Sequence, residues 1–335
     1  MPKYSIILPV RNGGEYVKDC IHSILKQTFT DFDLIVLDNC STDGTREWIS
    51  ALHEKKISII PSQTPLSIEE NWGRIKDVRK NEFITLIGHD DILYPEFLES
   101  IEKMMQKYPT ASLYHTHFDF IDAAGKVTRR CKPMPAVLTG NDLLKMMLVN
   151  NIDQMGTGYV MRSSDYDLLG GIPVKYPNLL YADFELWLRL ALQSYEAISP
   201  ENCFAFRVHK STTGLSQDKK LHTALKMFVE FLTECAAQNK ESLLIIKQFS
   251  HSFLAFYCKG YAHRLLRTSI KERDGLSVKD FISETKQLAI KLGVQDNYKP
   301  EKISSIKLAM MIDSNLLSRK LFLLFKKIYS KPVMG

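Results

Sequence analysis

The chain has 335 residues, of which 45% are hydrophobic and 24% are charged, and its formal net charge is +6. This composition excludes a disordered or collagen-like chain and allows two or three domains, or one large α/β domain with an appendage. The positive charge is too diffuse to indicate nucleic-acid binding, so we expect no nucleic-acid partner. The six cysteines form no C-x-x-C pair, which argues against a zinc ribbon. Buried free thiols in a reducing compartment are favoured over disulfides in an exported protein.

Targeting and membrane-spanning signals are not recognisable in the sequence. The N-terminus runs directly into a strand-like segment, without the basic and apolar regions of a signal peptide. Uninterrupted apolar runs stay below the roughly 18 residues that a membrane span needs. We therefore expect a cytoplasmic protein.

Strand and helix patterns alternate over residues 1–111. Short runs rich in Ile, Leu and Val are typical of buried parallel strands, and they occur at residues 4–10, 33–38, 57–60 and 83–87. Helical spacing of apolar residues follows Gly14 and Gly44, and the capping-box sequence that begins at Ser67 predicts a helix through Val78. This alternation predicts an α/β fold with βαβ units and a mostly parallel sheet flanked by helices.

The pattern changes after residue 111. We predict strands at 113–121, 158–161 and 204–208, and helices at 139–149 and 181–192. Strands largely disappear after about residue 214, where long helical patterns cover 221–237, 242–266, 278–292 and 303–328. The sequence therefore predicts a domain at 1–214, with halves 1–111 and 112–214, followed by a C-terminal helical region at 215–335.

Polar residues follow the predicted strands at one edge of the sheet, where open parallel sheets bind their ligands. The chain contains neither the G-x-G-x-x-G fingerprint nor a phosphate loop, which disfavours NAD and P-loop chemistry. Asp90 and Asp91 form an acidic pair after a buried strand. Such a pair suits Mg²⁺ or Mn²⁺, which prefer carboxylate and phosphate oxygens, although a helix N-cap before Pro95 explains it as well.

Six segments, in order, resemble glycosyltransferase family 2 enzymes of the GT-A fold, which is Rossmann-like. They are Ser5-Ile-Ile-Leu-Pro-Val-Arg-Asn12, Ser23-Ile-Leu-Lys-Gln-Thr28, Leu34-Ile-Val-Leu-Asp-Asn-Cys-Ser-Thr-Asp-Gly-Thr45, Gly88-His-Asp-Asp-Ile-Leu-Tyr-Pro95, Tyr181-Ala-Asp-Phe-Glu-Leu-Trp-Leu-Arg189 and Phe206-Arg-Val-His-Lys-Ser211. Each segment alone is degenerate, but their order is specific, and together they cover about residues 3–214.

The resemblance implies a nucleotide-binding set made of Pro9, Arg11, Asn12, Asp38, Arg74 and Asp90. Within this set, Asp38 would accept a hydrogen bond from a ring N–H of the base, commonly uracil, and Asp90 would reach the ribose or the metal. Arg11 departs from a common aromatic residue of the family. Asn12 is equally suited to holding the turn, and Arg74 to a solvated helix face.

The resemblance also implies a metal site and a catalytic base. Asp91 and His209 would ligate Mn²⁺ or Mg²⁺, which stabilises the charge that gathers on the leaving nucleoside diphosphate. Asp183 matches the aspartate that accepts the proton of the acceptor hydroxyl. Two positions depart from the family pattern, since Gly88 stands where an acidic residue is frequent and Ala182 replaces the usual Glu.

The function implied is that of an inverting glycosyltransferase of the hexosyl or N-acetylhexosaminyl class. It would move a sugar from a nucleotide-diphosphate donor, a UDP-sugar, to a hydroxyl of a saccharide or lipid-linked saccharide in surface polysaccharide biosynthesis. Two alternatives stay open. A nucleotidyltransferase would need a stronger phosphate-gripping loop than Arg11-Asn-Gly-Gly14, and a non-catalytic relative would bind the sugar nucleotide or act as a scaffold.

The C-terminal segment 303–331 mixes many apolar residues with Lys and Arg, and Asp313 is its single acid. This composition suits an interfacial helix on anionic lipid, which would make the protein peripheral on the inner face of the membrane. A core-packed helix with a solvated basic face, or an oligomer contact, would give the same pattern.

Overall fold

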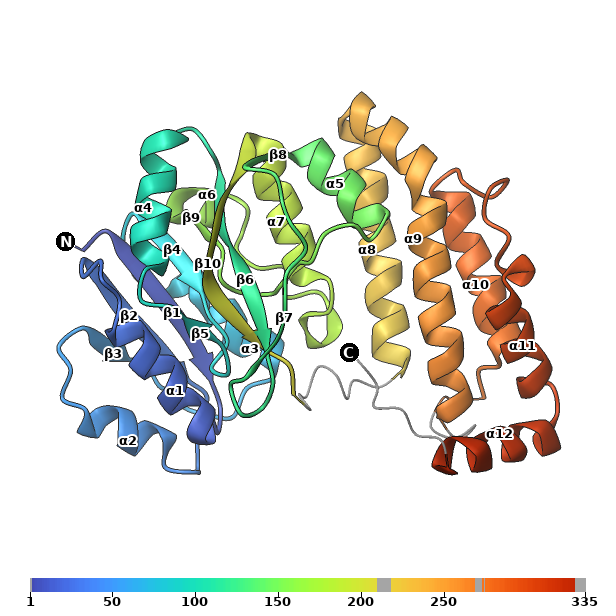
Figure 1. Cartoon of the computed structure of the whole chain (residues 1–335), viewed down its shortest axis with the longest axis horizontal. Helices are drawn as coiled ribbons and strands as arrows, with labels where there is room; N and C mark the ends of the chain where they lie inside the picture. The colour runs from blue at the N-terminus through green and yellow to red at the C-terminus, as the bar shows by residue number, and fades with distance from the viewer. Residues whose placement is uncertain (1, 210–217, 269–272, 274, 329–335) are drawn as a thin grey trace. The chain divides into compact units, whose positions relative to one another are not determined.

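The computed structural model describes residues 2–209, 218–268, 273 and 275–328 (Figure 1). The chain divides into two compact units, which we call the sheet unit (Met1–Leu143 and Ile152–Thr213) and the helical unit (Leu144–Asn151 and Gly214–Gly335). The boundary predicted after residue 214 lies outside the described residues, as do Lys210 and Ser211.

A sheet of ten strands, among the described residues, forms the centre of the sheet unit. Its first part is parallel, in the order β3 (Ile57–Ile59), β2 (Phe32–Asp38), β1 (Tyr4–Val10) and β4 (Phe83–Leu86). The continuous burial of β1 explains why its sequence is apolar apart from Ser5, because helices cover both faces of such a strand. The carboxyl ends of these strands meet at one edge, and the site lies there.

The second part of the sheet is mixed. It continues from β4 through β9 (Val160–Arg162), β6 (Leu113–Ile121), β10 (Tyr195–Arg207) and β5 (Ile92–Leu93), with β7 (Val127–Arg130) beside β6 and β8 (Val137–Thr139) beside β10. β6 and β10 are parallel, whereas β9 is antiparallel to both β4 and β6. The sequence did not predict β5, β7 or β8. β5 has only two residues and β7 is exposed throughout, so these two strands lack the run of buried apolar residues that predicts a strand.

The helices of the sheet unit are α1 (Gly14–Leu25), α2 (Thr45–Ala51), α3 (Ile68–Gly73), α4 (Phe97–Lys107), α6 (Ser163–Leu168), α7 (Ala182–Gln193) and the first part of α5 (Gly140–Leu148). The longer helices, such as α1 and α4, bury several apolar residues each, whereas the short helices bury one or two residues. The predicted capping box is present, since Glu70 donates its amide to Ser67 Oγ at 3.1 Å. The prediction that this helix continues to Val78 is wrong: it gives way to a 3₁₀ turn, Arg74–Asp77, where the Arg74 guanidinium bonds neighbouring carbonyls.

The helical unit contains α8 (Asp218–Gln238), α9 (Lys240–Arg267), α10 (Val278–Lys291), α11 (Ser304–Asp313) and α12 (Leu316–Ile328). The prediction of one helix over 303–328 is wrong, because the chain breaks between α11 and α12. Asn315 causes the break by accepting the Leu317 amide on its side-chain oxygen at 2.7 Å, which starts a new helix.

No helix within the described residues is both long and apolar enough to cross a membrane.

Candidate active site

The turn after β1 is locked to the loop after β2. Asn12 adopts a left-handed backbone (φ 54°), which Asn tolerates better than most residues. Its side-chain oxygen accepts the Thr42 amide at 2.8 Å, and its own amide donates to Ser41 Oγ at 2.9 Å. In this structure Asn12 therefore holds the turn. The neighbouring candidates differ in exposure, since Pro9 is buried within β1 and Arg11 is exposed.

Asp38 and Arg74 meet at the end of β2. Asp38 is buried, and both oxygens of its carboxylate lie 3.4 Å from the Ser41 amide. The Arg74 guanidinium donates to the Asp38 carbonyl at 3.3 Å and to the Ile60 carbonyl at 2.6 Å. Burial is the main cause that lowers the pKa of Arg74, and the Asp38 carboxylate opposes it. The Arg74 guanidinium and the Asp38 carboxylate thus both lie at the edge of the sheet where β2 ends.

Asp91 is the most firmly held carboxylate of the site, with 2% of its surface exposed. Thr157 donates its hydroxyl to Asp91 Oδ2 at 2.6 Å, and the amide of Arg207 donates to Oδ1 at 3.0 Å. Burial raises the pKa of Asp91 well above its usual range, and the negative charge of Asp90 adds to this effect. Hydrogen bonds from Thr157 and Arg207 stabilise the ionised carboxylate and so lower the pKa of Asp91 in part.

Asp90 and His209 form the neighbouring pair. His209 Nε2 lies 2.7 Å from Asp90 Oδ2, and the imidazole packs beside the Tyr16 ring with 4.9 Å between centroids. The structure therefore brings His209 to the same end of the sheet as the consecutive residues Asp90 and Asp91, which are distant from it in sequence.

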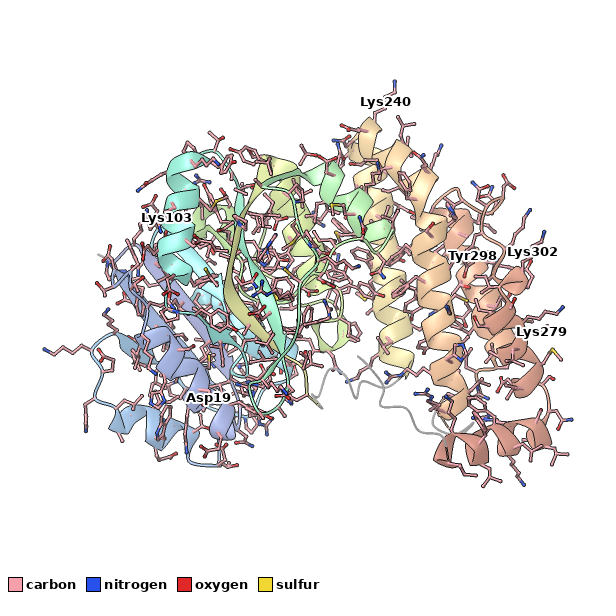
Figure 2. The ribbon with its side chains drawn as sticks, in the orientation of Figure 1. Asp19, Lys103, Lys240, Lys279, Tyr298 and Lys302 are labelled. Atoms are coloured by element: carbon pink, nitrogen blue, oxygen red, sulfur yellow. The ribbon has the colours of Figure 1, made fainter. Side chains whose placement is uncertain are left out.

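Arg207 is a buried cation whose side chain binds the backbone of this acidic pair. Its Nε donates to the Asp90 carbonyl at 2.8 Å, and its guanidinium lies 4.6 Å from the centre of the Tyr16 ring. Nη2 reaches Asp19 Oδ2 on α1 at 3.3 Å, and Asp19 is labelled in Figure 2. These contacts engage the guanidinium in holding the chain, so Arg207 acts as a positioning residue here.

The space beside Gly88 indicates whether Asp90 and Asp91 could bind a cation together. A Cβ placed on Gly88 would lie 2.8 Å from Asp90 Oδ1 and 3.0 Å from Asp91 Oδ2, so two carboxylate oxygens converge on one point. Oxygen donors of this kind fit Mg²⁺ or Mn²⁺. The described part of the chain contains no group of three or more His, Cys, Asp or Glu residues arranged to hold a metal ion. A cation would therefore need further oxygens from a ligand, as diphosphates supply.

Asp183 occupies the first turn of α7, after Tyr181 in a left-handed conformation (φ 69°). The carboxylate is half-buried and accepts the Phe184 amide at 2.9 Å. Burial raises the pKa of Asp183 to about 6, although main-chain hydrogen bonds lower it in part. A carboxylate with a pKa near neutrality is well matched to general-base work.

The segment from Met155 to Gly158 connects the two carboxylate regions. A Cβ on Gly156 would lie 3.5 Å from Asp183 Oδ2, while the next residue, Thr157, binds Asp91. The sequence analysis did not identify Thr157 as a residue of the site. Its flanking glycines were the available signal for a tightly packed loop.

A column of stacked rings supports this segment. The indole of Trp187 on α7 donates to the Met155 carbonyl at 2.9 Å and stacks on Tyr159, with 4.4 Å between ring centroids. Tyr159 stacks in turn on the buried ring of His115, at 4.3 Å. Burial lowers the pKa of His115 to about 3, so the imidazole is neutral at physiological pH. The column fixes the loop and the start of α7 together.

Known proteins resemble this chain in both sequence and structure. The family described as "Glycosyl transferase family 2" matches residues 5–163. The putative teichuronic acid biosynthesis glycosyltransferase TuaG of Bacillus subtilis is 25% identical over 214 residues, covering 61% of this chain and 78% of TuaG. The Escherichia coli UDP-Glc:alpha-D-GlcNAc-diphosphoundecaprenol beta-1,3-glucosyltransferase WfgD is 25% identical over 232 residues, covering 68% and 86%.

Solved structures share the fold. S. aureus TarS in complex with UDP-GlcNAc aligns with a TM-score of 0.68 at 15% identity, covering 92% of this chain and 91% of the TarS chain. The mannosyltransferase PcManGT from Pyrobaculum calidifontis, in complex with GDP-Man and Mn²⁺, aligns with a TM-score of 0.53 at 14% identity, covering 97% and 88%. At these identities the matches establish a GT-A fold, which confirms the fold expected from the sequence segments.

Proposed function

From the premise that this chain belongs to glycosyltransferase family 2 and is an enzyme of that class, we propose that it transfers sugar with inversion. The donor is a UDP-sugar, and the acceptor is a hydroxyl of a saccharide or lipid-linked saccharide. Residues 1–214 carry this activity, and residues 215–335 form an appended helical region.

The observation that carries the proposal is the state of Asp183. The carboxylate is half-buried at the start of α7, and its pKa is raised to about 6. At neutral pH it is ionised, yet it is basic enough to accept a proton from a hydroxyl as the new bond forms. Its position beside Gly156 puts it next to the loop that also binds Asp91.

The proposed reaction is a single displacement. The acceptor oxygen attacks the anomeric carbon and forms the new glycosidic bond, while the bond from that carbon to the diphosphate breaks. Asp183 takes the hydroxyl proton, and the nucleoside diphosphate leaves with the bonding electrons. One attack on the carbon inverts its configuration.

Residues at the strand ends are proposed to bind the donor. Asp38 and Arg74 suit recognition of the base, since they offer a buried acceptor and a cation at one edge. Asp90 would contact the ribose, with Asp91 and His209 as the groups that would hold Mn²⁺ or Mg²⁺. The bound cation would supply charge stabilisation for the leaving diphosphate. Pro9 and Arg11 border this edge, whereas Asn12 contributes by shaping the turn.

Three of these similar proteins support the choice of donor and pathway class. TarS was solved with UDP-GlcNAc, and WfgD uses UDP-Glc and acts on a diphosphoundecaprenol-linked sugar. TuaG is named for teichuronic acid biosynthesis, which favours surface polysaccharide assembly for this chain too. PcManGT with GDP-Man makes GDP the competing nucleotide to be tested. We propose a cytoplasmic site of action facing such lipid-linked acceptors.

The test is calorimetric titration of UDP and GDP, each with Mn²⁺ and with EDTA. We expect Mn²⁺-dependent binding of UDP to the wild type and its loss in Asp91→Asn. Asp31→Asn is the matched control, because Asp31 is an exposed aspartate of the same unit. UDP-sugars are then screened for release of the sugar.

Three results would contradict parts of the proposal, concerning the nucleotide, the metal and catalysis. Tighter binding of GDP than of UDP would overturn the donor assignment. Equal binding of UDP in EDTA and in Mn²⁺ would remove the metal from the proposal. Normal UDP binding with no release or transfer of sugar from a panel of UDP-sugars and acceptors would favour a non-catalytic protein.

A further inference from the structure

The last helix of the chain presents its apolar side to solvent. Four residues of α12 are between 57% and 69% exposed: Leu317, Leu321, Leu324 and Ile328. Their spacing places them on one face of the helix, which we call the α12 apolar face. Leu308 and Met311 of α11 are exposed as well. A surface helix normally buries such a face against the core, so this arrangement is reversed.

A buried ion network holds α12 in this reversed orientation. Arg319 is buried on the opposite side of the helix, donates to the Thr268 carbonyl at the end of α9, and lies 3.7 Å from Asp313. Asp313 also pairs with the buried Arg273 at 2.7 Å. Figure 1 shows α12 across this end of α9. Rolling the helix to bury its leucines would unpair buried charges, which is strongly unfavourable.

The exposed charges of α11 and α12 have one sign. Lys307 and Lys320 are exposed on the same two helices, and Asp313, the single acid of residues 303–328, is occupied in the buried network. An exposed apolar face accompanied by lysines is the pattern of a helix that lies in a membrane interface.

We propose that the α12 apolar face docks this protein on an anionic phospholipid surface, with α12 lying in the plane of the interface. The apolar side chains enter the boundary between headgroups and acyl chains, and Lys307 and Lys320 face the lipid phosphates. A second copy of the chain fits less well, because two such faces would bring like charges together. The proposal does not depend on the identity of the donor or acceptor.

The experiment is flotation of the full chain with vesicles of phosphatidylcholine alone and of phosphatidylcholine with phosphatidylglycerol. We expect binding to the anionic vesicles and a roughly tenfold fall in the partition coefficient for the double variant Leu321→Gln, Leu324→Gln. The control is Leu244→Gln, which removes a leucine that is 60% exposed on α9 and should bind as the wild type does. Because all three leucines are exposed, the variants are expected to keep the wild-type melting temperature.

A charge variant and an oligomer measurement complete the test. Lys307→Glu with Lys320→Glu should weaken binding to the anionic vesicles while changing binding to neutral vesicles little. Equal flotation of the wild type and the leucine double variant would overturn the proposal. So would absent binding of the wild type to anionic vesicles, and a dimer that the double variant abolishes would then identify a second copy as the occupant.

Discussion

Asp91 and Asp183 are both carboxylates whose pKa is raised by burial, yet the protein holds them in different ways. Asp91 is fixed by groups that come from far along the chain, the Thr157 hydroxyl and the Arg207 amide. Asp183 is held locally by main-chain amides at the start of its own helix. A carboxylate fixed by two hydrogen-bond donors from distant parts of the chain, such as Asp91, suits a binding role. Asp183 is held only by amides of its own helix end and is free to exchange a proton.

The largest expected effect separates the two roles directly. Asp183→Asn should lower the rate of sugar transfer by a factor of about 10²–10⁴, the usual contribution of a general base. Calorimetric affinity for UDP with Mn²⁺ should stay within about twofold of the wild type, because the donor contacts remain. A comparable loss of UDP affinity would show that Asp183 belongs to the donor site, and the division of roles between Asp91 and Asp183 would then be wrong.

The same variant has a stability signature. Burial raises the pKa of Asp183 from its ordinary value of 3.8 to about 6, so the folded state disfavours the ionised form. The cost is fully present above about pH 6 and disappears as the pH falls toward 3.8. Asp183→Asn should therefore melt at an equal or higher temperature than the wild type at pH 7.5, which a simple folding defect would not produce.

The next effect tests the locked carboxylate. Thr157→Val keeps the shape of the side chain but removes the hydroxyl that donates to Asp91. We expect Mn²⁺-dependent UDP affinity to fall about 10–100-fold, as is typical when the partner of a metal-binding group is lost. Thr157→Ser should restore most of the affinity because it restores the donor. Unchanged Mn²⁺ dependence in Thr157→Val would show that the Asp91 geometry does not matter for donor binding.

The smallest effect is a pH dependence. Because Asp183 must be ionised to accept a proton, kcat/KM should rise about tenfold per pH unit at low pH and level off above an apparent pKa of about 6. Rate measurements between pH 4.5 and pH 8 at saturating Mn²⁺ check this. A flat profile through pH 6 would show that another group controls proton transfer.

Local sequence patterns predicted the parallel half of the sheet, and the family segments predicted which side chains gather at its edge. Asp38, Asp90, Asp91 and Asp183 lie in segments whose residue types are characteristic. Thr157 lies outside these segments, and the hydrogen bonds that Thr157 and Arg207 make to Asp91 could not be predicted in this way, because they span 66 and 116 residues of chain. Such pairings depend on the folded sheet and leave no local pattern.

The two wrong helix predictions have a related cause. In each case a regular apolar spacing continues through a place where a polar side chain bonds the backbone instead. Asn315 caps α12 and interrupts the apparent long helix, and Arg74 draws its turn toward the carbonyls beside β2. Apolar periodicity reports which face is buried, but side-chain competition for backbone groups decides where a helix stops.

The ring column also has a consequence for spectroscopy. Of the three tryptophans, Trp187 is fully buried, whereas Trp48 and Trp72 are partly exposed. The indole of Trp187 bonds the carbonyl of Met155, at the start of the loop whose Thr157 hydroxyl donates to Asp91. Acrylamide should quench the other two indoles first, leaving an emission that comes from this one ring. The chain thus carries an intrinsic fluorescent reporter of how the loop at residues 155–158 responds to each ligand.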